Sequence, residues 1–71
     1  MKNALYGLTM KLEIIHLRKS GKKQVETAEM LGCSQAYVSL VMKEYREWTE
    51  YYDKLLTVRE VLKEAKAKHL I

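Results

Sequence analysis

The chain has 71 residues and a net charge of +4, which bounds it to one small, basic domain. A core of this size provides only roughly 3–5 kcal/mol of stability, and the single cysteine, Cys33, excludes an internal disulfide. No segment approaches the roughly 18 apolar residues that span a bilayer, and residues 1–13 lack the apolar run of a signal peptide. One cysteine and no export signal lead us to expect a cytoplasmic protein.

The composition favours helices throughout, because proline is absent and only three glycines occur. Leu8, Leu12 and Ile15 recur at helical spacing, and they predict a first helix over about residues 8–19. Residues 1–7 can extend this helix or form a loose arm, and Gly7 weighs against the extension. Gly21 follows this stretch and is typical of a helix end. We therefore expect an all-α fold.

Residues 24–43 predict two short helices joined by a tight turn, with the second helix reaching at least residue 45. Gly32 can adopt the left-handed conformation that ends one helix, and the Ser34 side chain can cap the next. Small Ala28 lies where two helices must cross closely. Val38 and Val41 are expected to bury the second helix against the first.

The spacing of Gln24, Ala28, Gly32, Val38 and Val41 resembles the helix-turn-helix family of DNA-binding proteins. Together with the preceding helix, it is similar to small phage and mobile-element repressors and to the helix-turn-helix of transposases, resolvases and terminase small subunits. The resemblance implies a tri-helical helix-turn-helix core whose last helix enters the major groove of double-stranded DNA. The alternative is a helical hairpin that merely shares this packing.

Candidate base-reading residues lie in the first turns of the helix after Ser34, because those turns meet base edges first. They are Gln35, Ala36 and Ser39. A glutamine can make a bidentate contact with adenine, an alanine can pack on a thymine methyl group, and a serine can bond to a base. The alternative for Gln35 is an exposed residue at a helix start.

The densest basic cluster comes immediately before the two motif helices and comprises Arg18, Lys19, Lys22 and Lys23. Residues 1–47 hold eight Lys/Arg against five Asp/Glu, so most of the positive charge accompanies the motif. We expect this cluster to contact DNA phosphates, although a solvated loop is the alternative. Further candidate backbone contacts are Gln24, Ser34, Tyr37 and Lys43, and Tyr37 can instead pack against the motif's first helix.

A last helix is predicted over most of residues 49–70, and it carries a heptad stripe. The stripe can pack back onto the first helix, or it can form the seam of a homodimer, and one face can serve both. We expect residues 1–47 to form the DNA-binding core and residues 48–71 to serve dimerisation or core closure. The stripe consists of Trp48, Tyr51, Leu55, Val58, Leu62, Ala65 and His69.

No constellation of side chains predicts catalysis or metal binding, since His16 and His69 stand apart and no Cys/His cluster occurs. We therefore expect no enzyme activity, cofactor, metal or small-molecule substrate. The predicted function is that of a small sequence-specific DNA-binding regulator, repressor-like and homodimeric. The alternatives are a DNA-recognition module of a packaging or transposition machine, such as a terminase small subunit or an excisionase-like accessory protein, and a protein–protein interaction module.

Overall fold

A computed structural model of the chain describes residues 4–67 and contains four α-helices within them. The helices are α1 (Ala4–Lys19), α2 (Gln24–Leu31), α3 (Gln35–Glu47) and α4 (Thr49–Ala67). The described part of the chain has no strand, so the predicted all-α fold is confirmed. His69, the last position of the predicted heptad stripe, lies outside the described residues.

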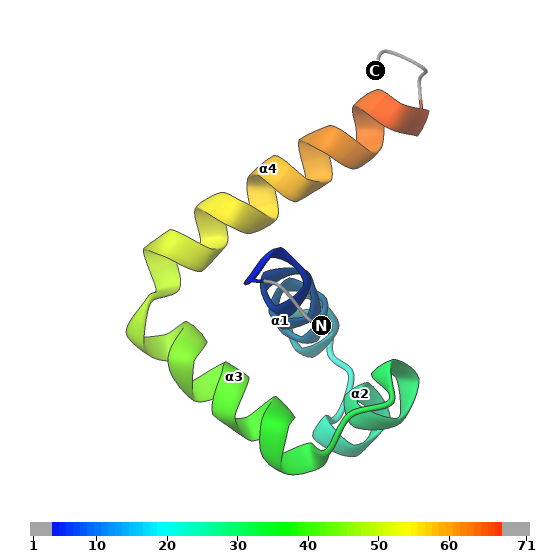
Figure 1. The fold of residues 1–71 in the computed structure, drawn as a ribbon, viewed down its shortest axis with the longest axis vertical. Coiled ribbons are helices and arrows are strands. Elements are labelled where there is room, and N and C mark those ends of the chain that lie inside the picture. Colours follow the sequence, from blue (N-terminus) through cyan, green and yellow to red (C-terminus); the bar gives the residue numbers. More distant parts are fainter. Residues whose placement is uncertain (1–3, 68–71) are drawn as a thin grey trace.

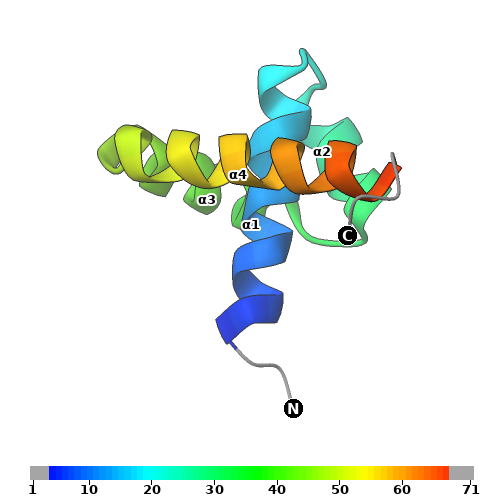
Figure 2. The same cartoon turned by 90° about the horizontal axis from the view of Figure 1, so that it is seen from above.

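Helix α1 occupies the centre of the fold, and the other three helices pack around it (Figure 1). Ile14 and Ile15 are both fully buried. Neighbouring residues of a helix point about 100° apart, so two adjacent buried residues require cover on more than one side. The apolar stripe of α1 is therefore broad because this helix has three partners. Seen from above, α4 crosses α1, and the amino-terminal part of α1 extends beyond the other helices (Figure 2).

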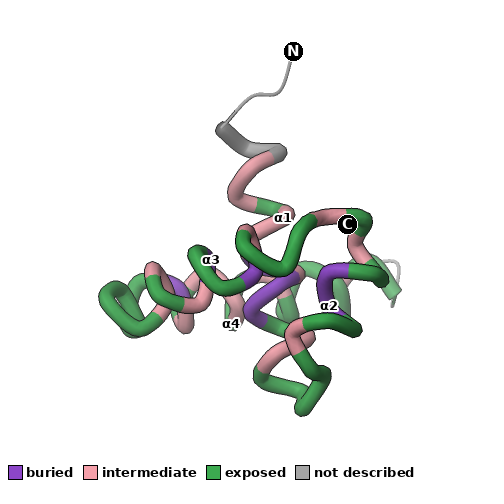
Figure 3. Tube along the Cα trace, turned by 90° about the horizontal axis from the view of Figure 1, so that it is seen from below, coloured by how far each residue is buried: buried purple, intermediate pink, exposed green. Residues whose placement is uncertain are grey.

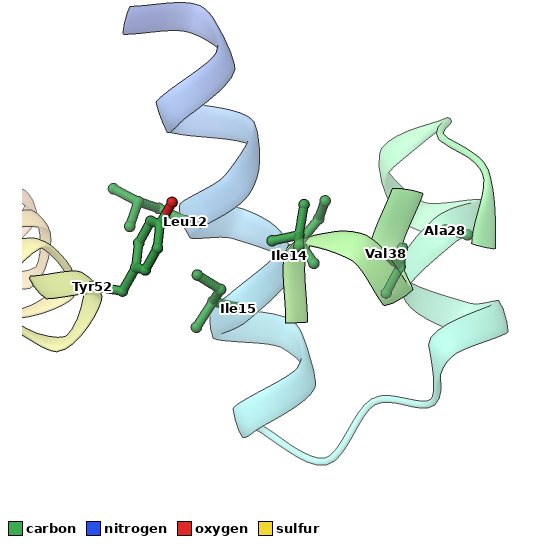
Figure 4. Close-up of a cluster of buried hydrophobic side chains, with 7 residues drawn as sticks. Leu12, Ile14, Ile15, Ala28, Val38 and Tyr52 are labelled. Atoms are coloured by element: carbon green, nitrogen blue, oxygen red, sulfur yellow. The ribbon is translucent and has the colours of Figure 1, made fainter. Parts of the chain in front are cut away.

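The core has two halves on either side of α1 (Figure 4). On one side, Leu12 and Ile15 lie close to the ring of Tyr52 from α4. On the other side, Ile14 points toward Val38 of α3, and Ala28 of α2 lies beyond it. Burial along the chain follows this pattern, with the buried segments facing α1 and the outer surfaces of α2, α3 and α4 exposed (Figure 3). One core therefore joins all four helices.

The turn between α2 and α3 has the conformation that the sequence predicted. Gly32 adopts φ 68° and ψ 35°, which is the left-handed region. The Cys33 main-chain N–H then donates to the Ala28 carbonyl at 3.0 Å. The Ser34 hydroxyl oxygen accepts from the Tyr37 main-chain N–H at 3.1 Å and caps α3. Gly32 and Ser34 thus perform the predicted roles.

Helix α1 begins at Ala4, so residues 4–7 extend the helix that the sequence predicted from about residue 8. Gly7 lies inside the first two turns. A glycine in a helix costs about 1 kcal/mol relative to alanine, and the good helix formers on either side of it outweigh that cost. Of the two possibilities left open for residues 1–7, the described residues 4–7 thus continue the helix.

Ion pairs and hydrogen bonds fasten α4 to the rest of the fold. Asp53 of α4 accepts from the Lys19 ammonium group at 3.2 Å and from the Tyr45 hydroxyl at 2.8 Å. Arg59, one and a half turns further along α4, forms an ion pair with Glu13 of α1. These contacts join α4 to α1 and α3 at two levels, so the orientation of α4 does not depend on Tyr52 alone. No helix of the described residues is long and apolar enough to cross a membrane.

Candidate nucleic-acid interface

Helix α3 is anchored on one side and free on the other. Val38 and Val41 are buried and face the core, together with half-buried Tyr45. Given 3.6 residues per turn, the residues between them point away from the core. This outward face of α3 consists of Gln35, Ala36, Ser39, Leu40, Lys43, Arg46 and Glu47, all of which are exposed. The three predicted base-reading residues therefore lie together on one exposed helical surface.

The amino-terminal ends of α2 and α3 meet at this surface. The Gln24 side-chain amide donates to the main-chain carbonyl of Gln35 at 3.1 Å. Gln24, predicted as a phosphate contact, is thus half-buried and orients the first turn of α3. Its position also brings the turn before α2 next to the start of α3, so the two halves of the predicted interface are adjacent.

The basic cluster before α2 divides into two pairs with different surroundings. Lys22 and Lys23 are exposed, and neither forms an ion pair with any described residue. Arg18 is half-buried, and its guanidinium donates to the Lys22 carbonyl at 2.6 Å, which shapes the turn. Lys19 pairs with Asp53 of α4. Within this cluster, only the ammonium groups of Lys22 and Lys23 are therefore exposed without an ion pair among the described residues, although the Glu26 carboxylate accepts from the Lys23 main-chain N–H.

The surroundings of Lys19 favour its charged form and that of its partner. Contacts with Tyr45 first, and with the Asp53 carboxylate second, raise the pKa of Lys19. The Tyr45 hydroxyl first, and the Lys19 ammonium group second, lower the pKa of Asp53. The Lys19 ammonium also lies over the Tyr45 ring, 5.5 Å from its centroid. Lys19 thus has a structural role between α1, α3 and α4.

The remaining predicted backbone contacts have varied environments. The Ser34 hydroxyl is exposed and serves as the cap of α3. Tyr37 is half-buried and packs against the core. Lys43 is exposed on the outward face of α3 and has no ion pair within residues 4–67. Lys22, Lys23 and Lys43 are thus the lysines that surround the free face of α3.

A polar network fixes the opposite edge of α3. Glu44 accepts from the Lys11 ammonium group of α1 at 3.1 Å and from the Tyr52 hydroxyl of α4 at 2.5 Å. These two partners, Tyr52 before Lys11, lower the pKa of Glu44. Burial first, and the Glu44 carboxylate second, raise the pKa of Tyr52. A charged Glu44 therefore connects α1, α3 and α4 at one point.

The predicted heptad stripe of α4 is divided between the core and solvent. Leu55 is half-buried against the core, and Ala65 is also half-buried. At least half the surface of each other described member is exposed, namely Trp48, Tyr51, Val58 and Leu62. The residue of α4 that enters the core is instead Tyr52, which the stripe does not include. The exposed apolar stripe of α4, defined here as Trp48, Tyr51, Val58, Val61 and Leu62, remains available to a partner.

A shallow groove runs beside this stripe, between α4 and the middle of α1. Its floor is apolar, and the basic residues of α4 lie along its rim. Its lining comprises Thr9, Leu12, Leu55, Val58, Arg59, Leu62, Lys63 and Lys66. The groove and the exposed stripe share Val58 and Leu62, so they form one continuous surface.

Three residues of the outward face of α3 were not among the site residues predicted from the sequence, namely Leu40, Arg46 and Glu47. They share this face with Gln35, Ser39 and Lys43, and all three are exposed. Their positions could have been inferred from the helical spacing once Val38 and Val41 were assigned to the core. The burial of Thr27 could not have been inferred in this way. Its hydroxyl donates to the Lys23 carbonyl at 3.0 Å.

Within residues 4–67, no group of three or more His, Cys, Asp or Glu side chains could hold a metal ion. Comparisons with protein-family models, with curated proteins and with solved structures found no match for this chain. The candidate site is therefore supported by its geometry alone. It consists of an anchored helix with an exposed, mostly polar face and exposed lysines beside it.

Proposed function

We propose that this chain is a small sequence-specific DNA-binding protein, a repressor-like transcriptional regulator that acts as a homodimer in the cytoplasm. The observation that carries the proposal is the outward face of α3. Val38 and Val41 hold the helix from behind, and its exposed side offers Gln35, Ala36 and Ser39 in the first two turns. An exposed helix held in this way fits the major groove, where side chains of the first turns reach base edges.

The charge around α3 supports the same proposal. Lys22 and Lys23 lie beside the start of α3, because Gln24 connects the two helix ends, and Lys43 follows on the outward face. Lysines placed on either side of a groove-reading helix can contact the phosphates that flank the groove. The amino-terminal end of α3 adds partial positive charge at the same place, whereas the amino-terminal end of α2 is capped by the Glu26 carboxylate, which accepts from the Lys23 main-chain N–H at 2.9 Å. Phosphate contacts of this kind would fix the position of α3 on the duplex.

The proposed mode of action is steric. A dimer bound to a two-fold symmetric operator within a promoter would exclude the polymerase from that DNA. The exposed stripe of α4 is the proposed dimer seam, since it consists of large apolar side chains outside the core, all of them except Val61 at heptad positions. This arrangement needs no chemistry from the protein, only simultaneous contact of two α3 helices with two half-sites.

A titration of two variants tests the proposal. The parent chain, Gln35→Ala and Val38→Ala are each titrated against duplexes recovered from a random pool and against unselected duplexes, with thermal melts alongside. We expect Gln35→Ala to lose roughly 1–3 kcal/mol on recovered duplexes and much less on unselected ones. Val38→Ala should lower the free energy of unfolding by about 2 kcal/mol through lost packing, and it should weaken binding to both kinds of duplex equally.

Two results would contradict the proposal. If the parent chain binds neither kind of duplex at low salt, the DNA-binding assignment fails and a protein-interaction role replaces it. If Gln35→Ala weakens recovered and unselected duplexes equally, Gln35 reads no base. A ring of many subunits in solution would instead favour an assembly module of a packaging machine over a dimeric regulator.

A further inference from the structure

Leu40 is a large apolar side chain on a surface whose other members are alanine, serine, glutamine and charged residues. It is the one large apolar residue on the outward face of α3 as the structure describes it, and 59% of its surface is exposed. It lies one turn after Ala36 and one turn before Lys43, so these three residues are neighbours along the helix. Leu40 contributes nothing to the core, because Val38 and Val41 already fill the opposite side of α3.

The surroundings of Leu40 restrict the kind of partner that could cover it. Lys43 lies beside it on α3, and Lys22 and Lys23 lie near the start of the same helix. Arg46 and Glu47 lie further along the outward face, so its basic groups outnumber its one acidic group. An apolar spot within a basic surface is complementary to a polyanion that carries an apolar group. The major groove of DNA offers one such group at its base edges, the C5-methyl of thymine. A protein partner would have to bring acidic residues to the same place.

We infer that Leu40, with Ala36 one turn before it, recognises thymine methyl groups, so that the bound DNA carries thymine opposite the middle of α3. The inference rests on the proposed function and deepens it, since it specifies part of the base sequence. Recognition by Leu40 is a contact between apolar surfaces and uses no hydrogen bond. Gln35 and Ser39 remain for hydrogen bonds to the neighbouring base pairs.

The test removes the methyl group from the DNA without changing base pairing. Duplexes that the parent chain retains from a random pool are remade with each thymine replaced in turn by deoxyuridine, which lacks only the C5-methyl. We expect one or two replacements in each half-site to weaken binding about fourfold, the factor that corresponds to burial of one methyl-sized group. Leu40→Ala should weaken binding to the thymine duplex by a similar factor. It should bind the deoxyuridine duplex as tightly as the parent chain does, because the contact that the substitution removes is already absent there.

Met30→Ala supplies a matched control. Met30 is also an apolar residue with 59% of its surface exposed, but it lies on α2 and outside the outward face of α3. Its truncation removes a comparable amount of exposed apolar surface. We expect Met30→Ala to retain the full difference between thymine and deoxyuridine duplexes, and both variants to melt at the temperature of the parent chain.

The outcomes separate this inference from the proposed function. If the parent chain retains duplexes but no deoxyuridine replacement changes its affinity, the inference is wrong and the DNA-binding proposal stands. The same conclusion follows if Leu40→Ala weakens thymine and deoxyuridine duplexes by the same factor. If the parent chain retains no duplex at all, the proposed function itself fails, and the inference falls with it.

Discussion

Glu44 connects α3 to both α1 and α4. Its carboxylate accepts hydrogen bonds from Lys11 of α1 and from Tyr52 of α4. A hydrogen bond to a charged group contributes roughly 1.5–3 kcal/mol when it is protected from solvent, and the partial exposure of Glu44 lowers that contribution. Because Glu44 and Val41 hold neighbouring sides of the same helix, loss of the Glu44 charge should loosen α3 relative to α4.

A prediction about pH follows from the lowered pKa of Glu44. A carboxylate whose pKa is lower in the folded chain than in the unfolded chain stabilises the fold at high pH and loses that effect as pH falls. The loss should begin below about 4.5, the ordinary value, and continue through the lower folded-state pKa. We expect Glu44→Gln to lower the free energy of unfolding at pH 7 and to show a smaller drop than the parent between pH 5 and 3.

Urea unfolding at a series of pH values measures this difference. Glu60→Gln is the matched control, because Glu60 is an exposed glutamate on α4 whose nearest cation, Arg59, is 3.7 Å away and already paired with Glu13. Parallel pH profiles for the parent chain and Glu44→Gln would contradict a stabilising role for the Glu44 charge. Asp53 has a lowered pKa as well, so some acid sensitivity should remain in both proteins.

At the level of elements, the turn between α1 and α2 carries the charge that should determine nonspecific affinity. DNA affinity is expected to fall with salt at a log–log slope of about −0.9 for each phosphate neutralised. Replacing Lys22 and Lys23 with alanine should therefore flatten the slope by about 0.9 for each lysine and weaken all sequences alike. The measurement is a binding titration at four or more salt concentrations.

The control for this experiment removes the same charge elsewhere. Lys63 and Lys66 are exposed on α4, at the rim of the groove and away from the outward face of α3. Their replacement by alanine lowers the net charge by the same amount and should leave the slope nearly unchanged. If the salt-dependence slope flattens equally in both double variants, the overall charge of the protein governs DNA binding, and the turn before α2 has no special role.

The elements that could be predicted from sequence depend on local contacts. The bounds of α2 were predicted as observed, because Gly32 and Ser34 act on the main chain of their immediate neighbours. The anchoring valines of α3 follow from helical spacing alone, and so does the exposed face opposite them. The likeness of residues 24–43 to a known motif added an expectation of function, which stays a prediction.

The role of α4 could not be predicted in the same way, because it depends on where the chain turns after α3. Two apolar stripes overlap on this helix, one through Tyr51 and Val58 and the other through Tyr52 and Leu56. The bend at Trp48, with φ −124° and ψ 42°, directs the second stripe to the core. The pairing of Lys19 with Asp53, 34 residues apart, follows from the same bend and had no local signal.

The dimensions of the whole molecule suit a dimer that is joined through the exposed stripe of α4 and bound to two DNA half-sites. The principal extents are 38, 30 and 25 Å, and the half-sites of a two-fold operator lie about 34 Å apart, one turn of DNA. Two copies joined side by side could thus place their α3 helices in successive major-groove segments. Exposed aromatic and aliphatic side chains such as Trp48, Tyr51 and Leu62 would be covered in the same step.

We predict that the parent chain is a homodimer and that the double variant of Val58→Lys and Leu62→Lys is monomeric. Both residues are at least half exposed, so charged replacements should break the seam without unfolding the domain. Leu55 belongs to the predicted seam but is half-buried against the core. Its replacement would both break the seam and destabilise the fold, so the two effects could not be told apart. Because a dimer binds its second half-site at high effective concentration, the monomer should bind a two-fold duplex at least on the order of 100-fold more weakly.

Sedimentation equilibrium at high micromolar concentration, combined with binding titrations on whole and half operators, measures both effects. Met30→Lys is the control, since it places a lysine at an exposed apolar position of α2, away from the stripe. It should remain dimeric and keep the parent's preference for the whole operator. The monomeric double variant should bind whole and half operators with similar affinity, because it engages one half-site at a time. A parent chain that sediments as a monomer at these concentrations would rule out the α4 seam and leave the stripe to a different protein.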